Sequence, residues 1–187
     1  MKRLSNFVEN IEIAPLLNNE QDDVRSYNDV LIDMLKNAYY EEIIAWYSYV
    51  TVCNFINGAN RKDVEEFFED TAKDEFEDHG LWLLKRISEL GGNMEIGCDP
   101  VSLSYAKHKQ TPYIWTIGEN PNDKVLTVLN AVEANIKNEE GAIETYTQLE
   151  EYTRDIDVVT NQKVKSILAD EQEHLKELQD FKLDLIK

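Results

Sequence analysis

The chain has 187 residues, 42% hydrophobic and 30% charged, so it is long enough and apolar enough to fold as one globular domain. Its 37 acidic residues outnumber its 19 basic residues, which gives a formal net charge of -18. Because nonspecific nucleic-acid affinity comes mostly from basic side chains that neutralise phosphates, this balance argues against a nucleic-acid partner. It favours a role with cations, although acidity alone also serves solubility.

Membrane and secretion signals are missing from the sequence. No stretch reaches the roughly 20 apolar residues of a membrane helix, and the N-terminus lacks the apolar core of a signal peptide. We therefore expect no membrane association and a cytoplasmic location. Cys53 and Cys98 form no CxxC pattern and suit a reducing compartment, although two cysteines also suffice for one disulfide.

The first predicted helix follows a short N-terminal segment. Residues 1–22 show no sustained periodicity and are interpreted as an extension with at most a short helix, which leaves 23–187 as the domain. From about Ser26 to Ile56, apolar residues recur at the three-and-four spacing of a helix. The Asn57-Gly58 pair then ends this helix.

A second helix is predicted from about Lys62 to Leu90, where a pair of glycines stops it. Residues 91–121 break the helical pattern and contain three of the four prolines. A segment of this length usually serves as a crossover or a functional connection. A short helix from about Val101 to His108 could interrupt it.

The third and fourth helices form a second hairpin. Pro121 to Asp123 indicate a helix start, and the third helix is predicted to run to about Tyr152. After a turn at Asp155 to Asp157, the fourth helix runs from about Val158 to the end. The sequence therefore predicts an all-α four-helix bundle made of two helical hairpins and a long crossover.

Three glutamates interrupt the apolar faces of these helices. Glu42, Glu139 and Glu171 each lie at helical spacing from apolar residues of their own helix, namely Leu35 and Ala45, Ile136 and Ala142, and Ile167 and Leu178. They are therefore expected to face the core. A buried carboxylate is so costly that it takes up a proton or binds a cation.

Histidines accompany the glutamates in the second and fourth helices. Glu171 and His174 form a Glu-x-x-His pair, whereas His79 follows Glu75 at i+4. Both offsets share a helix face, and a local bulge could realign the second pair, but Asp78 at i+3 is a rival ligand. We favour His79. Four carboxylates and two imidazoles suit iron or manganese.

The two halves of the chain also repeat a motif. Glu42, Ala45 and Tyr49 match Glu139, Ala142 and Tyr146 as Glu-x-x-Ala-x-x-x-Tyr. Glu75 then follows Glu42 by 33 positions, and Glu171 follows Glu139 by 32. This similarity indicates that one helical hairpin has been used twice, with a glutamate-and-histidine set in each copy.

These motifs resemble the ferritin-like superfamily, in particular bacterioferritins and Dps-like mini-ferritins, over about Asn28 to Phe181. The resemblance implies a ferritin-like four-helix bundle with two iron ions inside each subunit, and manganese or zinc as substitutes. It implies that Glu42 and Glu139 are terminal ligands, that Glu75 and Glu171 bridge the ions, and that His79 and His174 each cap one. The core tyrosines Tyr49 and Tyr146 are expected beside the site.

The resemblance also implies a function. We expect a ferroxidase that oxidises Fe(II) with peroxide or oxygen, stores the product and protects against oxidative damage. No fifth helix follows the fourth, so a homo-oligomeric 12-subunit cage is expected. The second helix lacks methionine where bacterioferritins place their haem ligand, so no haem is expected. The alternatives are a rubrerythrin-like di-iron peroxidase without storage and a non-catalytic, metal-stabilised interaction bundle.

Overall fold

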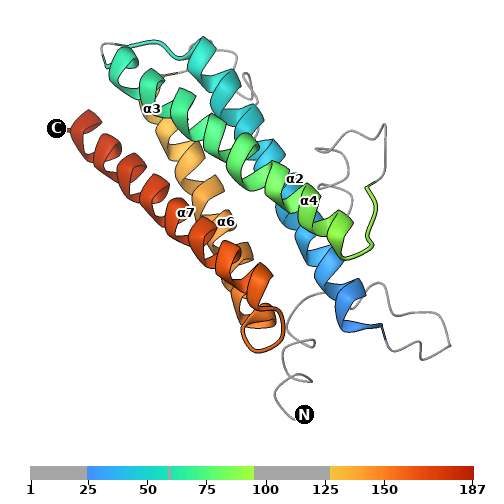
Figure 1. Ribbon diagram of the computed structural model, residues 1–187. Helices are drawn as coiled ribbons and strands as arrows, with labels where there is room; N and C mark the ends of the chain where they lie inside the picture. Colours follow the sequence, from blue (N-terminus) through green and yellow to red (C-terminus); the bar gives the residue numbers. More distant parts are fainter. Residues whose placement is uncertain (1–24, 59, 95–126) are drawn as a thin grey trace, which may run out of the picture.

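The computed structural model describes residues 25–58, 60–94 and 127–187, and every element among them is helical. These residues form four helical rods, packed as two antiparallel hairpins (Figure 1). The elements in chain order are α2 (Tyr27–Phe55), α3 (Arg61–Lys73), η2 (Asp74–Gly80), α4 (Leu81–Glu89), α6 (Val128–Thr153) and α7 (Val158–Leu185). The predicted all-α four-helix bundle is confirmed.

The helix ends follow local capping chemistry. Ser26 caps α2 through a reciprocal pair of hydrogen bonds with Asp29, and Asp157 caps α7 by accepting from the Thr160 amide. The elements α3, η2 and α4 follow one another as the second rod. Gly91 comes after this rod and has a positive φ of 83°, a conformation that favours glycine. These three boundaries lie within a residue or two of their predicted positions.

The start of α6 differs from the prediction. Thr127 is extended, and its hydroxyl accepts the Asn130 amide, so the helix begins at Val128. The helix therefore begins later than predicted, because Thr127 caps it, and the predicted start at residues 121–123 lies outside the described residues. The extension over residues 1–22, the short helix at 101–108 and Cys98 lie outside the described residues.

The second rod changes its helical geometry halfway. Between α3 and α4, the seven residues of η2 form a π-helix, which is wider than an α-helix. The Leu81 amide at its end donates to the Phe76 carbonyl, five residues back instead of four. One extra residue is thus accommodated in the turn without ending the rod.

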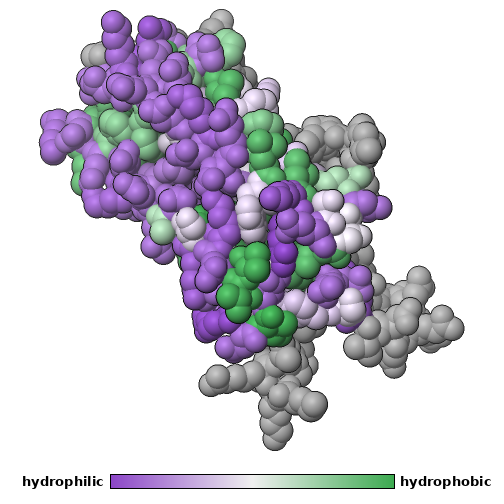
Figure 2. All heavy atoms as spheres, viewed as in Figure 1, coloured by the Kyte–Doolittle hydropathy of each residue, from purple (hydrophilic) through white to green (hydrophobic). Residues whose placement is uncertain are grey.

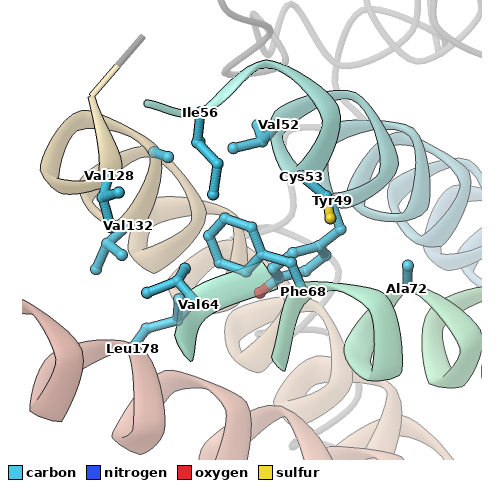
Figure 3. Close-up of a cluster of buried hydrophobic side chains, with 11 residues drawn as sticks. Tyr49, Val52, Cys53, Ile56, Val64, Phe68, Ala72, Val128, Val132 and Leu178 are labelled. Carbon is cyan, nitrogen blue, oxygen red and sulfur yellow. The ribbon is translucent and has the colours of Figure 1, made fainter. Parts of the chain in front are cut away.

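Two apolar clusters fill the bundle on either side of a polar middle. Figure 3 shows the first, in which side chains of α2, α3, α6 and α7 converge. Cys53 lies in this cluster and is 7% exposed, as expected of a small core residue. The second cluster contains Leu31, Leu35, Leu83 and Ile167. Along α2, residue 42 lies between the two clusters.

The two hairpins are tied together at the end that holds the α6–α7 turn. The Arg86 guanidinium on α4 contacts the Asp157 carboxylate at 2.7 Å and donates to the Thr160 hydroxyl at 2.7 Å. Both charged side chains are mostly buried, so the contact fixes the second rod against the start of α7. Among the described helices, none has the length and apolar character needed to cross a membrane.

Candidate metal centre

The six predicted site residues all lie in the interior of the bundle. Each rod supplies at least one of them, with Glu42 on α2, Glu139 on α6, and the other four on η2 and α7. Their exposed fractions are 2% for Glu42, 1% for Glu75, 0% for His79, 1% for Glu139, 0% for Glu171 and 8% for His174. Charged residues are almost never buried to this degree without a partner.

The six side chains form two overlapping groups. In each group, one potential ligand atom from every member lies within 4.8 Å of the others. The first group comprises Glu42, Glu75, His79 and Glu171, and the second comprises Glu75, Glu139, Glu171 and His174. Glu75 and Glu171 belong to both groups, which is the placement that carboxylates bridging two ions require.

Both imidazoles turn the same ring nitrogen toward the shared glutamates. His79 Nδ1 lies 3.3 Å from Glu75 Oε2 and 3.2 Å from Glu171 Oε1. His174 Nδ1 lies 3.5 Å from Glu75 Oε1 and 3.7 Å from Glu171 Oε2. Each shared carboxylate therefore directs one oxygen to each histidine.

The π-helix explains why the late histidine reaches the centre. Glu75 and His79 both lie within η2, where the wider turn keeps residues four apart on the inner side. Asp78 points outward instead, with its side chain 57% exposed and in contact with the Lys163 ammonium. Asp78 joins neither inner group, although it lies in an outer group with His79 and Asp170.

The electrostatics of the centre follow from the burial of four carboxylates close together. Burial and the charge of Glu171 raise the pKa of Glu42 well above its usual range, and burial and the charge of Glu75 do the same for Glu139. Burial alone would raise the pKa of Glu75, but the adjacent imidazoles of His174 and His79 outweigh it and lower that pKa.

The imidazoles hold protons more tightly than usual. Burial opposes the charged form of His174, but Glu171 and Glu75 outweigh it and raise its pKa to about 10. The pKa of His79 is also raised, because Glu171, Glu42 and Glu75 surround the ring against the effect of burial. Positive charge on the two imidazoles therefore offsets part of the negative charge of the carboxylates.

Several buried atoms of the centre have no hydrogen-bond partner, which tests whether a metal fits there. Such orphaned atoms are rare in native interiors and require an explanation. They are Glu75 Oε1, Glu139 Oε2, both carboxylate oxygens of Glu171, His174 Nδ1 and His79 Nε2. The carboxylate oxygens and His174 Nδ1 face one another inside the centre, whereas His79 Nε2 faces Asp170. Carboxylate and imidazole ligands in this arrangement suit a pair of iron or manganese ions.

Two tyrosines hold the remaining glutamates from across the bundle. The Tyr49 hydroxyl donates to Glu139 Oε1, and the Tyr146 hydroxyl donates to Glu42 Oε1. Both tyrosines are almost fully buried. Each hairpin thus positions a glutamate of the other. The resemblance implied that these tyrosines lie beside the site, but it did not imply that each donates to the glutamate of the other hairpin.

Two aspartates, missed by the sequence analysis, contact the outer edges of the imidazoles. His79 Nε2 lies 3.4 Å from Asp170 Oδ2, and His174 Nε2 lies 3.7 Å from Asp74 Oδ2. A carboxylate at the second ring nitrogen fixes the orientation of a metal-binding histidine. An aspartate directly precedes each shared glutamate in the sequence, but only the packing of the two hairpins brings it to the histidine of the other hairpin.

The fold has counterparts among known proteins. The family model of the ferritin-like domain matches residues 32–185. The chain is similar to the bacterioferritin-related protein from Bacteroides fragilis, described as a dodecameric thioferritin. The identity is 30%, over 85% of this chain and 88% of that chain, with a TM-score of 0.71.

Two more distant structures share the fold. One is a ferritin-like di-iron-carboxylate protein from Bacillus anthracis, with 21% identity over 85% of this chain and 99% of that chain and a TM-score of 0.66. The other is Dps from Thermosynechococcus elongatus, with 21% identity over 83% and 91% and a TM-score of 0.66. A search of curated proteins found no match.

Proposed function

The chain belongs to the ferritin-like family, and we propose that it is a ferroxidase and iron-storage mini-ferritin that oxidises Fe(II) with peroxide or oxygen. The observation that supports this most is the pair of buried ligand groups that share Glu75 and Glu171. Two ions held side by side can deliver two electrons to one oxidant. By consuming iron and peroxide together, the protein would protect against oxidative damage.

The residues of the centre have distinct tasks in this proposal. Glu75 and Glu171 hold both ferrous ions, Glu42 and Glu139 each bind one, and the two histidines complete the set. With peroxide as oxidant, two ferrous ions give up one electron each, and peroxide takes these two electrons with two protons to form two waters. The four carboxylates stabilise the ferric product, because their negative charge favours the higher oxidation state of the ions.

Storage requires assembly, and we propose a hollow homo-oligomer of 12 subunits. The dodecameric assembly of the Bacteroides fragilis protein supports this, since it is 30% identical over most of both chains. The net charge of -18 would attract ferrous ions toward such a shell.

The test compares two neighbouring glutamates on α7. Glu171→Gln removes a shared buried ligand without changing its shape, whereas Glu173→Gln changes an exposed acid two residues away. Under peroxide or oxygen, absorbance of the ferric product should rise at the parent rate in Glu173→Gln and at least about 100-fold more slowly in Glu171→Gln. Equal rates in parent and Glu171→Gln would refute the assignment of the site.

Counting the iron retained per chain separates storage from catalysis alone. After repeated additions of Fe(II) and oxidant, a storage protein should keep tens of iron atoms or more per chain. Two per chain would instead indicate a peroxidase-like enzyme without storage. Retention of metal without any oxidation would indicate a structural bundle.

A further inference from the structure

Gly80 is a glycine in the interior of a helical rod. It is buried and ends η2, and its φ of -60° and ψ of -48° are ordinary helical values. Backbone freedom is therefore not the reason for a glycine here. Because glycine is disfavoured in helix interiors relative to alanine, its presence at this position calls for another cause.

The space around Gly80 supplies that cause. A Cβ atom at this position would lie 3.1 Å from the Glu75 carbonyl oxygen, closer than most real contacts of this kind, so that the carbonyl would have to move. The same Cβ would lie 3.9 Å from Cε2 of Tyr39, which is an ordinary van der Waals contact. The tight neighbour is thus the backbone of Glu75, five residues back, and Glu75 is one of the shared glutamates.

Spacing of five residues is characteristic of the π-helix. In this geometry the carbonyl of residue i faces residue i+5 instead of i+4. Relaxing the contact by returning to α-helical geometry would rotate the residues after Glu75 relative to it. The residue at i+3, Asp78, would then compete with His79 for the inner side.

We propose that Gly80 is a positioning residue, which permits the π-helix and thereby places His79 instead of Asp78 at the metal centre. The consequence for metal binding rests on the proposed function, whereas the effect on the helix does not. The test therefore measures both, on the whole chain.

The experiment uses Gly80→Ala in two backgrounds. Deleting the exposed Glu77 removes one residue from η2, so that the segment can form a regular α-helix with Glu and His at i and i+3. Gly80→Ala should lower the Tm and weaken metal binding in the parent, and it should do neither in the deletion variant. Gly141→Ala is the matched control, because Gly141 also lies in a helix near a predicted ligand and a Cβ there would meet no atom within 4 Å.

Two readouts apply to every variant, namely the Tm of the metal-free protein and the binding of Co(II) by equilibrium dialysis. In the parent, Gly80→Ala should lower the Tm by at least about 3 °C and weaken one of two Co(II) positions by about tenfold or more. In the deletion background it should leave the Tm unchanged or raise it, and both Co(II) ions should remain. Gly141→Ala should behave like the parent or be more stable.

A second test, which does not use the deletion variant, introduces Gly80→Ala into the Tyr39→Leu variant. If Gly80 only makes room for the Tyr39 ring, Gly80→Ala should not lower the Tm of the Tyr39→Leu variant. That result would overturn the proposal. An equal penalty in both backgrounds, or no penalty in the parent, also overturns it. If the parent binds no Co(II), the proposed function fails, and the Tm comparison still decides the role of Gly80.

Discussion

At the scale of single residues, four carboxylates and two imidazoles share one buried volume. Two protonated imidazoles balance only two of the four possible negative charges. The pKa values of Glu42 and Glu139 are raised, because burial and the neighbouring glutamates favour the protonated form of each. A pair of divalent ions would balance all four carboxylates and replace those protons.

The first prediction concerns pH. Metal must displace the protons held by Glu42, by Glu139 and by His174, whose pKa is about 10. Raising the pH lowers the competition from protons, so the apparent affinity for Mn(II) should increase from about pH 6 to about pH 8. Titration in a weak buffer should also show proton release. Affinity that is independent of pH, or proton uptake on binding, would contradict the account.

The second prediction separates the two rival ligands of η2. His79→Ala should empty one metal position and leave one Co(II) per chain. Asp78→Ala should retain two, because Asp78 is largely exposed and its contact with Lys163 is a surface ion pair worth about 1 kcal/mol or less. Dialysis followed by metal analysis measures both. Loss of a metal only in Asp78→Ala would mean that the aspartate is the ligand.

At the scale of helices, the connection between the hairpins depends on Asp157. This side chain caps α7 through the Thr160 amide and pairs with Arg86, and it is mostly buried. Asp157→Ala removes both interactions and should lower the free energy of unfolding by about 2 kcal/mol. Asp155→Ala, in the same turn but exposed, should change it by less than about 0.5 kcal/mol. Denaturant titration measures the free energy of unfolding of both variants. Similar losses in the two would show that the contacts of Asp157 with Arg86 and Thr160 contribute nothing to stability.

Most helix boundaries could be predicted because each is decided locally. The hydroxyl of Ser26 and the carboxylate of Asp157 cap helices wherever they precede an apolar repeat. The start of α6 could not be predicted, because Pro121 and Thr127 both fit a helix start and nothing local chooses between them.

The inward glutamates were predictable from periodicity, because a carboxylate at the spacing of core residues must face the core. The sequence does not decide whether this segment is an α-helix or a π-helix, since residues four apart share a face in an α-helix as well. Contacts that form only in the folded bundle, such as those of His79 with the other rods, distinguish the two geometries. The contacts of Asp74 and Asp170 were missed because they join residues of different hairpins, which no spacing within one helix reveals.

At the scale of the whole molecule, charged and polar side chains cover much of the face seen in Figure 2. The net charge of -18 means that the chain repels phosphates while it attracts cations. The function we propose uses this surface to gather ferrous ions, without any role for nucleic acid.

The fourth prediction follows from this charge. At about 150 mM salt, the protein should not retard duplex DNA in a gel, because too few basic side chains are available to neutralise phosphates. A shift that weakens as salt is raised would contradict it, since that dependence is the mark of phosphate contacts.

We propose that one buried centre holds two ions through two shared glutamates. The most direct measurement is a crystal structure of the iron-loaded protein with anomalous diffraction recorded at the iron edge. Two peaks per chain are expected, one among Glu42, Glu75, His79 and Glu171 and one among Glu75, Glu139, Glu171 and His174. A single peak, or peaks only outside these six side chains, would contradict it.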